Sequence, residues 1–94
     1  MSEDLVSAIE YVVMDVIVEL DDDPNLENIT AALNKRIRGP LDPQKLHRIL
    51  GKMRASGLLV YRPGALEIIY LVTAEGHVAM DKMLSWAAER IDKQ

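Results

Sequence analysis

Eight of the eleven Lys and Arg residues in this chain lie within positions 35–62, where the one acidic residue is Asp42. These cations are Lys35, Arg36, Arg38, Lys45, Arg48, Lys52, Arg54 and Arg62. The segment has a formal charge of +7, and the remaining three cations and fourteen acids give the rest of the chain −11. A basic stripe within an acidic domain is typical of a surface that contacts nucleic acid. Alternatively, these cations simply occupy the solvent-exposed faces of two helices.

The spacing of the cations favours the first interpretation. Asp42 and Pro43 are typical of the start of a helix, and Gly57 is typical of the residue that ends one. One face of the helix predicted between them is apolar and consists of Leu46, Ile49, Leu50 and Met53. The opposite face carries cationic and hydrogen-bonding side chains, namely Gln44, Lys45, Arg48 and Lys52. We therefore expect a basic ridge exposed to solvent.

Other chemistry is poorly represented in the sequence. The chain has no Cys, so no thiol nucleophile, disulfide or thiolate zinc site is expected. His47 and His77 lack a nearby pattern of metal ligands, and the three acids at 21–23 lack the Gly and distal Glu of an EF-hand. No phosphate-binding glycine loop and no Ser-His-acid grouping is present. The sequence predicts a protein that is not an enzyme and holds no cofactor or metal.

Size and composition predict one small domain over residues 1–94. The chain is 49% hydrophobic with no Phe, so its core must consist of aliphatic side chains and Met. Glu3 and Asp4 stand where a signal peptide would carry positive charge. The most apolar run, residues 5–20, contains three acids and is too short to cross a bilayer. We expect a cytoplasmic protein without membrane association.

Residues 5–20 are rich in Val, but their length and period favour a helix over a strand. One face of this helix consists of Leu5, Ile9, Val12, Val13, Val16 and Leu20. A second apolar stripe, Tyr11, Met14 and Val18, lies on the opposite side. A helix that is apolar on both sides is usually buried on both sides. In so small a chain, we expect a second subunit to cover the stripe, with packing inside one chain as the alternative.

The region after this helix predicts a second helix and a hairpin. Asn25 is a typical N-cap for a helix over 26–37, which Gly39-Pro40 would end. Its buried face would consist of Leu26, Ile29, Leu33 and Ile37. Two strands, over 58–61 and 66–72, flank residues 62–65, where Pro63 and Gly64 are the residues that a type II turn requires.

Thr73 is the expected cap of a last helix that runs to about residue 92. Its predicted buried face consists of Met80, Met83, Leu84, Ala87 and Ile91. A second flank contains Ala79, Met83, Trp86 and Arg90.

The order of elements predicts a mainly α fold with a small β-hairpin: helix, helix, helix, strand, strand, helix. A turn between two helices, the second of them basic, followed by a hairpin, is the winged helix-turn-helix arrangement. The expected layout is an N-terminal helix in 1–20, the helix-turn-helix in 25–57, the wing hairpin in 58–72 and a C-terminal helix in 73–94.

Two motifs carry a family resemblance. Residues 42–59, DPQKLHRILGKMRASGLL, resemble the recognition helix of PadR-like regulators and, more loosely, of MarR-like ones, with the pattern S-P-x-T-[LV]-Y-R-x-L-x-x-L-x-x-x-G-L-[IL]. Residues 70–76, YLVTAEG, are similar to the Y-x-L-T-x-E-G that joins the wing to the last helix in that family. The chain departs from the pattern at His47, where the family has Tyr, and at Leu26-Glu27, where it commonly has Gly-Tyr.

The resemblance implies a transcriptional repressor that binds double-stranded DNA. The helix over 43–56 would enter the major groove, with base contacts from Gln44, Lys45 and Arg48. Phosphate contacts would come from Lys35, Arg36, Arg38, Lys52, Arg54 and Arg62. The alternative is a winged-helix module that docks another protein, which the acidic remainder and a wing with one cation, Arg62, would suit.

The resembled families also assemble as dimers, which fits the second apolar stripe. The predicted homodimer interface consists of Tyr11, Met14, Val18, Met83 and Trp86. Trp86 and Met83 are also where a small apolar effector would be expected to bind, by the same resemblance.

Overall fold

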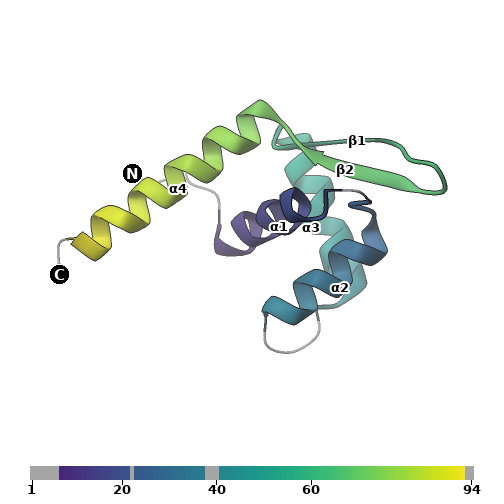
Figure 1. Ribbon diagram of the computed structural model, residues 1–94, viewed down its shortest axis with the longest axis horizontal. Coiled ribbons are helices and arrows are strands. Elements are labelled where there is room, and N and C mark those ends of the chain that lie inside the picture. Colours follow the sequence, from purple (N-terminus) through teal and green to yellow (C-terminus); the bar gives the residue numbers. More distant parts are fainter. Residues whose placement is uncertain (1–6, 22, 38–40, 93–94) are drawn as a thin grey trace.

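The computed structural model describes residues 7–21, 23–37 and 41–92, and the side chains of these up to residue 90. Its elements are α1 (Ala8–Glu19), α2 (Leu26–Arg36), α3 (Pro43–Ala55), β1 (Leu59–Pro63), β2 (Ile68–Val72) and α4 (Ala74–Asp92). The first three helices and the hairpin form a compact body, from which α4 extends outward (Figure 1). The predicted order and the mainly helical content are confirmed.

Short-range hydrogen bonds fix where the helices begin. At α1, the Ser7 hydroxyl accepts from the Glu10 N–H, and the Glu10 carboxylate accepts from the Ser7 N–H at 2.9 Å, which is a capping box. The Asn25 side chain accepts from the Asn28 N–H at 2.8 Å, as predicted for the N-cap of α2. The predicted features at Leu5 and at Gly39-Pro40 lie outside the described residues.

Both predicted ends of α3 are confirmed. The Asp42 carboxylate accepts from the Gln44 N–H, and Pro43 is the first helical residue. At the other end, the Gly57 N–H donates to the Arg54 carbonyl and the Leu58 N–H donates to the Met53 carbonyl. These two bonds form a Schellman motif, which requires the left-handed conformation that Gly57 adopts, with φ of +83°. The turn directs the chain from α3 into the wing.

The hydrophobic core consists of buried side chains from all four helices and from β1. Its buried side chains are Val13, Met14, Val16, Ile17, Ile29, Leu33, Leu46, Leu50, Met53, Leu59, Ala79 and Met80. Helix α1 contacts α2, β2 and α4 of the same chain.

Met14 corrects one prediction. Its side chain is fully buried, and its sulfur would lie 3.3 Å from a Cβ placed on Gly76 of α4. The sequence placed Met14 in a stripe covered by a second subunit, whereas α4 of the same chain packs over it. Of the other two members of the stripe, Tyr11 is half-buried and Val18 is 45% exposed.

The wing hairpin forms, but its turn lies further along the chain than predicted. The strands pair from Leu59↔Val72 to Pro63↔Ile68, so Arg62 and Pro63 belong to β1. The Gly64 N–H donates to the Glu67 carbonyl at 2.7 Å and closes the hairpin. Gly64 does not have the positive φ that a type II turn would require, so this prediction was wrong. Continued strand pairing outweighed the local preference of Pro63-Gly64, and β1 is an edge strand, where a proline is tolerated.

Thr73 and Gly76 fasten α4 to the end of α3. The Thr73 hydroxyl donates to the Gly57 carbonyl at 2.6 Å and accepts from the Gly76 N–H at 3.0 Å, which confirms the predicted cap. A Cβ on Gly76 would lie 2.5 Å from the Leu58 carbonyl oxygen. Glycine is therefore required here, because α4 starts in direct contact with the α3–β1 turn.

The outer part of α4 differs from the prediction. Of the predicted buried face, Met80 is buried with its neighbour Ala79, Met83 and Ala87 are half-buried, and Leu84 is 54% exposed. The side chain of Ile91 lies outside the described part of the chain. The prediction was wrong for Leu84 because α4 extends past the body, and no other described element reaches it (Figure 1).

None of the helices formed by the described residues has the length and hydropathy needed to cross a membrane.

The two glycines on α3 and its cap should respond oppositely to substitution by alanine. We expect Gly57→Ala to lower the free energy of unfolding by about 1–2 kcal/mol, because an L-residue is strained in the left-handed region. The new Cβ would also lie 3.0 Å from a carboxylate oxygen of Glu75. Gly51→Ala is the matched control, since nothing lies within 4 Å of the added Cβ, and it should raise stability by about 0.5–1 kcal/mol. Urea denaturation of both variants tests this, and an unchanged midpoint for Gly57→Ala would contradict it.

Candidate nucleic-acid interface

Helix α3 separates its side chains into a buried face and a basic face. Leu46, Leu50 and Met53 are at most 1% exposed and fix the rotation of the helix against the core. Gln44, Lys45, Arg48 and Lys52 are all exposed on the other side, as the sequence predicted. In the described residues, the ion pairs involve Arg36 alone, so the charges of Lys45, Arg48 and Lys52 are not neutralised within them. These three cations remain available to an external anion.

Arg36 does not share this availability. Its guanidinium, at the end of α2, forms ion pairs with Asp15 and Glu19 of α1. Its hydrogen bond to Asp15, followed by the one to Glu19, raises the pKa of Arg36 above its ordinary value. The predicted phosphate contact from Arg36 is therefore not supported, because two acids on the neighbouring helix already bind this cation. Neighbouring Lys35 is exposed, and Arg38 lies outside the described residues.

Arg54 links α3 to the wing. Its guanidinium carbon lies 4.3 Å from the centroid of the Tyr61 ring on β1. Tyr61 is paired with Tyr70 across the hairpin, with 6.3 Å between ring centroids and an angle of 45° between the planes. Neither tyrosine was among the predicted site residues. The available signal was one aromatic residue in each strand directly after a basic helix.

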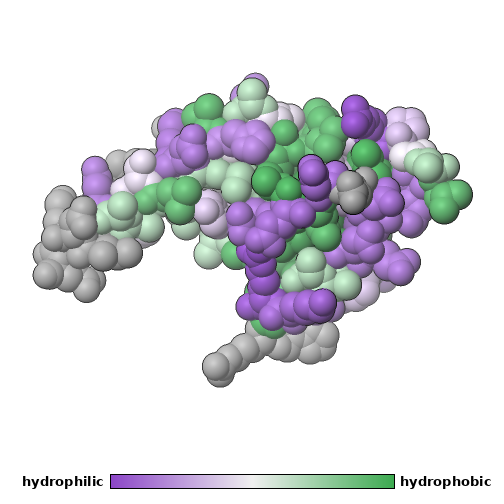
Figure 2. Space-filling view, in the orientation of Figure 1, coloured by the Kyte–Doolittle hydropathy of each residue, from purple (hydrophilic) through white to green (hydrophobic). Residues whose placement is uncertain are grey.

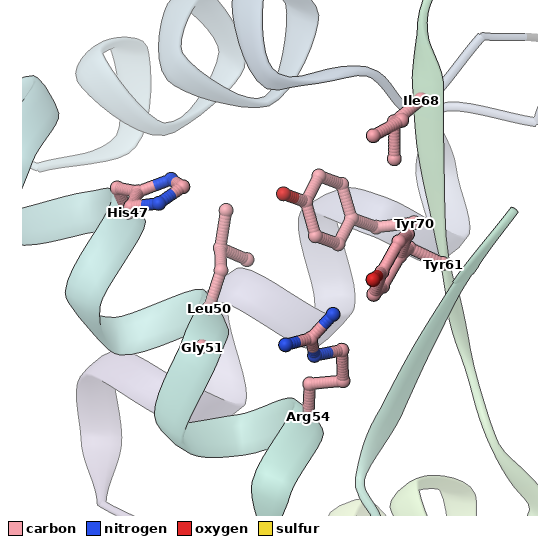
Figure 3. A pocket seen from close by; sticks show the side chains of 7 residues that line it. All are labelled: His47, Leu50, Gly51, Arg54, Tyr61, Ile68 and Tyr70. Atoms are coloured by element: carbon pink, nitrogen blue, oxygen red, sulfur yellow. The ribbon is translucent and has the colours of Figure 1, made fainter. Parts of the chain in front are cut away.

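A cleft of about 210 Å³ lies between α3 and the hairpin (Figure 3). His47 and Arg54 border it from α3, and Tyr61 and Tyr70 border it from the wing. The remaining lining residues are Leu50, Gly51 and Ile68. His47 thus lies between the basic face and the wing.

The outer part of the wing combines one cation with apolar side chains. Arg62 is exposed on β1, while Leu66 and Ile68 are 97% and 50% exposed. Apolar surface accordingly appears at the free end of the hairpin (Figure 2). The wing is less basic than the helix beside it.

A helix-turn-helix whose second helix is basic, followed by a wing hairpin, defines a winged helix-turn-helix protein. No protein-family model and no characterised protein matches the sequence. Solved structures do match the fold.

One matching structure is a MarR family transcription regulator, with a TM-score of 0.75, 17% identity and coverage of 97% of this chain and 58% of that one. Another is BpsR of Bordetella bronchiseptica, whose DNA binding is regulated by 6-hydroxynicotinic acid, with a TM-score of 0.73, 14% identity and coverage of 94% and 60%. A third is a possible HxlR family transcriptional factor from Thermoplasma volcanium, with a TM-score of 0.67, 19% identity and coverage of 94% and 77%.

At these identities the likeness is in the fold, and it confirms the predicted winged helix and its looser similarity to MarR proteins. The chain spans about three fifths of the length of the first two structures. The more specific PadR-like resemblance stays a prediction.

Neutralising Arg36 should affect stability through its ion pairs. We expect Arg36→Gln to lower the free energy of unfolding by less than about 1 kcal/mol at low salt, since its partners are partly exposed. The difference from the wild type should shrink in about 1 M salt, where screening acts over about 3 Å. Lys35→Gln is the neighbouring control and should leave stability unchanged. An equal loss in both variants, measured by thermal denaturation, would contradict this assignment of the ion pairs.

Proposed function

We propose that this protein is a DNA-binding transcription regulator that acts as a repressor and inserts α3 into the major groove. The observation that carries this proposal is the row of exposed cations on α3 without acidic partners among the described residues. In a helix-turn-helix, the second helix contacts base edges while the first crosses the backbone. The known DNA-binding activity of BpsR, which has a similar fold, supports the same assignment.

The proposed contact residues fall into two groups, those that would contact bases and those that would contact phosphates. Gln44 and Arg48 would form bidentate hydrogen bonds to adenine and guanine, and Lys45 would bind acceptors on guanine. Lys35, Lys52, Arg54 and Arg62 would contact phosphates, which fix the register on DNA without selecting sequence.

A homodimer would explain the apolar surface of α4. Val78 and Leu84 are each 54% exposed and Trp86 is 37% exposed, on a helix that extends from the body. Burial of these side chains together with Met83, Tyr11 and Val18 in a two-fold interface would remove this surface from water. Two recognition helices would then lie about 34–36 Å apart and bind a palindromic site.

We propose that the effector predicted near Met83 and Trp86 binds between the subunits of this dimer. One face of the Trp86 ring is already covered by Arg90, whose guanidinium lies 4.7 Å from the ring centroid.

DNA binding should depend on salt and on the basic face of α3. The wild type should bind a labelled random-sequence duplex with an affinity that falls steeply as salt rises, because each bound phosphate releases counterions. A Lys45/Arg48/Lys52 triple-alanine variant should lose this binding while remaining folded. Fluorescence anisotropy at low and moderate salt, with circular dichroism as the folding control, provides the measurement. Undiminished binding by the variant would contradict the assignment.

Single substitutions should separate base contacts from phosphate contacts. On a selected operator, Arg48→Ala should reduce discrimination at one base pair by about 1–3 kcal/mol. Lys52→Ala should instead weaken all sequences similarly and lower the salt slope by about 0.9. Parallel titrations of matched and mismatched operators provide the comparison, and identical specificity profiles for the two variants would show that α3 is docked differently.

The dimer should depend on Trp86. We expect Trp86→Glu to weaken self-association at least tenfold, because a charge would replace a large apolar side chain in a desolvated interface. Ser85→Glu places the same charge on the neighbouring exposed residue of α4 and serves as the control. Sedimentation equilibrium measures both, and a monomeric wild type would contradict the dimer.

A protein-docking module remains the second candidate, favoured by the apolar end of the wing. Leu66 is 97% exposed there, and a cation would suit a DNA contact better than leucine. Absence of DNA binding by folded wild type at low salt would select this function.

A further inference from the structure

The cleft between α3 and the wing concentrates hydrogen-bond donors from three elements. His47 and Arg54 come from α3, Tyr61 from β1 and Tyr70 from β2, and the Tyr70 hydroxyl points into the cleft toward α3 (Figure 3). Imidazole, guanidinium and phenol groups can all donate to an anionic oxygen. No carboxylate occurs among the residues that line the cleft. This composition suits a bound anion.

The Tyr61 ring holds Arg54 in place. The guanidinium carbon lies over the ring, 4.3 Å from its centroid, which is a cation–π contact. A cation–π contact uses the charge and not the N–H donors, so the guanidinium can still form bidentate hydrogen bonds to phosphate oxygens. A side chain that is already positioned loses less conformational freedom when it binds.

Gly51 leaves the α3 side of the cleft open. It lies within α3, is exposed, and has nothing within 4 Å of the Cβ that another residue would add. Its φ is not positive, so neither packing nor backbone conformation within the described residues requires glycine. A glycine inside a helix is less stable than alanine. The absent side chain instead permits close approach of a bound group to the helix backbone.

We propose that this cleft binds a phosphodiester group of the DNA backbone, beside the groove that α3 enters. The inference rests on the proposed function and deepens it, since it adds Tyr61, Tyr70, His47 and Gly51 to a contact assigned only to Arg54. Arg54 binds the phosphate oxygens from one side, His47 and the Tyr70 hydroxyl donate from the others, and Tyr61 positions Arg54. The cleft thereby joins recognition helix and wing into one binding surface.

The test uses the full chain, a labelled random-sequence duplex and anisotropy over a series of salt concentrations. Arg54→Gln should lower the slope of log affinity against log salt by about 0.9, the value for one lost phosphate contact. Arg90→Gln is its matched control, because it removes the same charge from an arginine that also stacks on an aromatic ring, and its slope should equal that of the wild type.

Two further variants report on the cleft without a change in charge. Tyr70→Phe should weaken binding several-fold and leave the salt slope unchanged, because it removes a neutral donor. Gly51→Leu should weaken binding at least tenfold by filling the cleft, while thermal denaturation shows a protein at least as stable as the wild type. That stability measurement separates lost binding from lost folding.

The outcomes distinguish this inference from the proposed function. If the folded wild type does not bind DNA at low salt, both are overturned. If it binds, and Arg54→Gln, Tyr70→Phe and Gly51→Leu retain wild-type affinity and slope, the cleft assignment alone is overturned.

A last experiment measures the displacement of DNA by inorganic phosphate, compared with chloride at equal ionic strength. Displacement of DNA by phosphate from the wild type but not from Arg54→Gln supports the cleft as the phosphate site. Phosphate binding at the cleft without any effect of its variants on DNA would assign it to a free anion instead.

Discussion

The junction after α3 is the constraint on which the other parts of the structure depend. The left-handed Gly57 ends α3, and the Gly57 and Leu58 carbonyls both accept from Thr73, which also caps α4. The absence of a side chain on Gly76 lets α4 begin against the Leu58 carbonyl. Helix α3, the wing and α4 therefore meet at one hydrogen-bonded junction, which sets their relative directions. The same junction fixes where the exposed cations of α3 lie relative to the exposed apolar side chains of α4.

In the part of the chain that the structure describes, the ion pairs between acidic and basic side chains all involve Arg36. Asp15 and Glu19 on α1 bind Arg36, which ties α1 to the end of α2 and neutralises one member of the basic segment. The cations on α3 are exposed on the side of the helix opposite its buried residues. An acidic protein can in this way keep a confined basic face, because its acids and its exposed cations lie on different parts of the surface.

The elements and their ends were largely predictable because they depend on nearby residues. Asn25, Asp42 with Pro43, Gly57 and Thr73 each act within a few positions, and the structure confirms all of them. The apolar period likewise predicted which side of α3 would be buried, and therefore where its cations would be exposed. The wing turn was misplaced because strand pairing, which joins residues on two segments, outweighed the preference of Pro63-Gly64.

The sequence by itself determined the helices, their caps, the hairpin and the exposed basic face of α3, since propensity, capping and periodicity are local. Tertiary structure decided what covers each apolar stripe and which charges are paired. Met14 proved to be core because α4 folds over α1, and Arg36 proved to be bound because α2 ends beside the acids of α1. The cleft of His47, Arg54, Tyr61 and Tyr70 also exists only after the hairpin folds beside α3. Each of these features depends on contacts between segments distant in the chain, and local patterns do not specify such contacts.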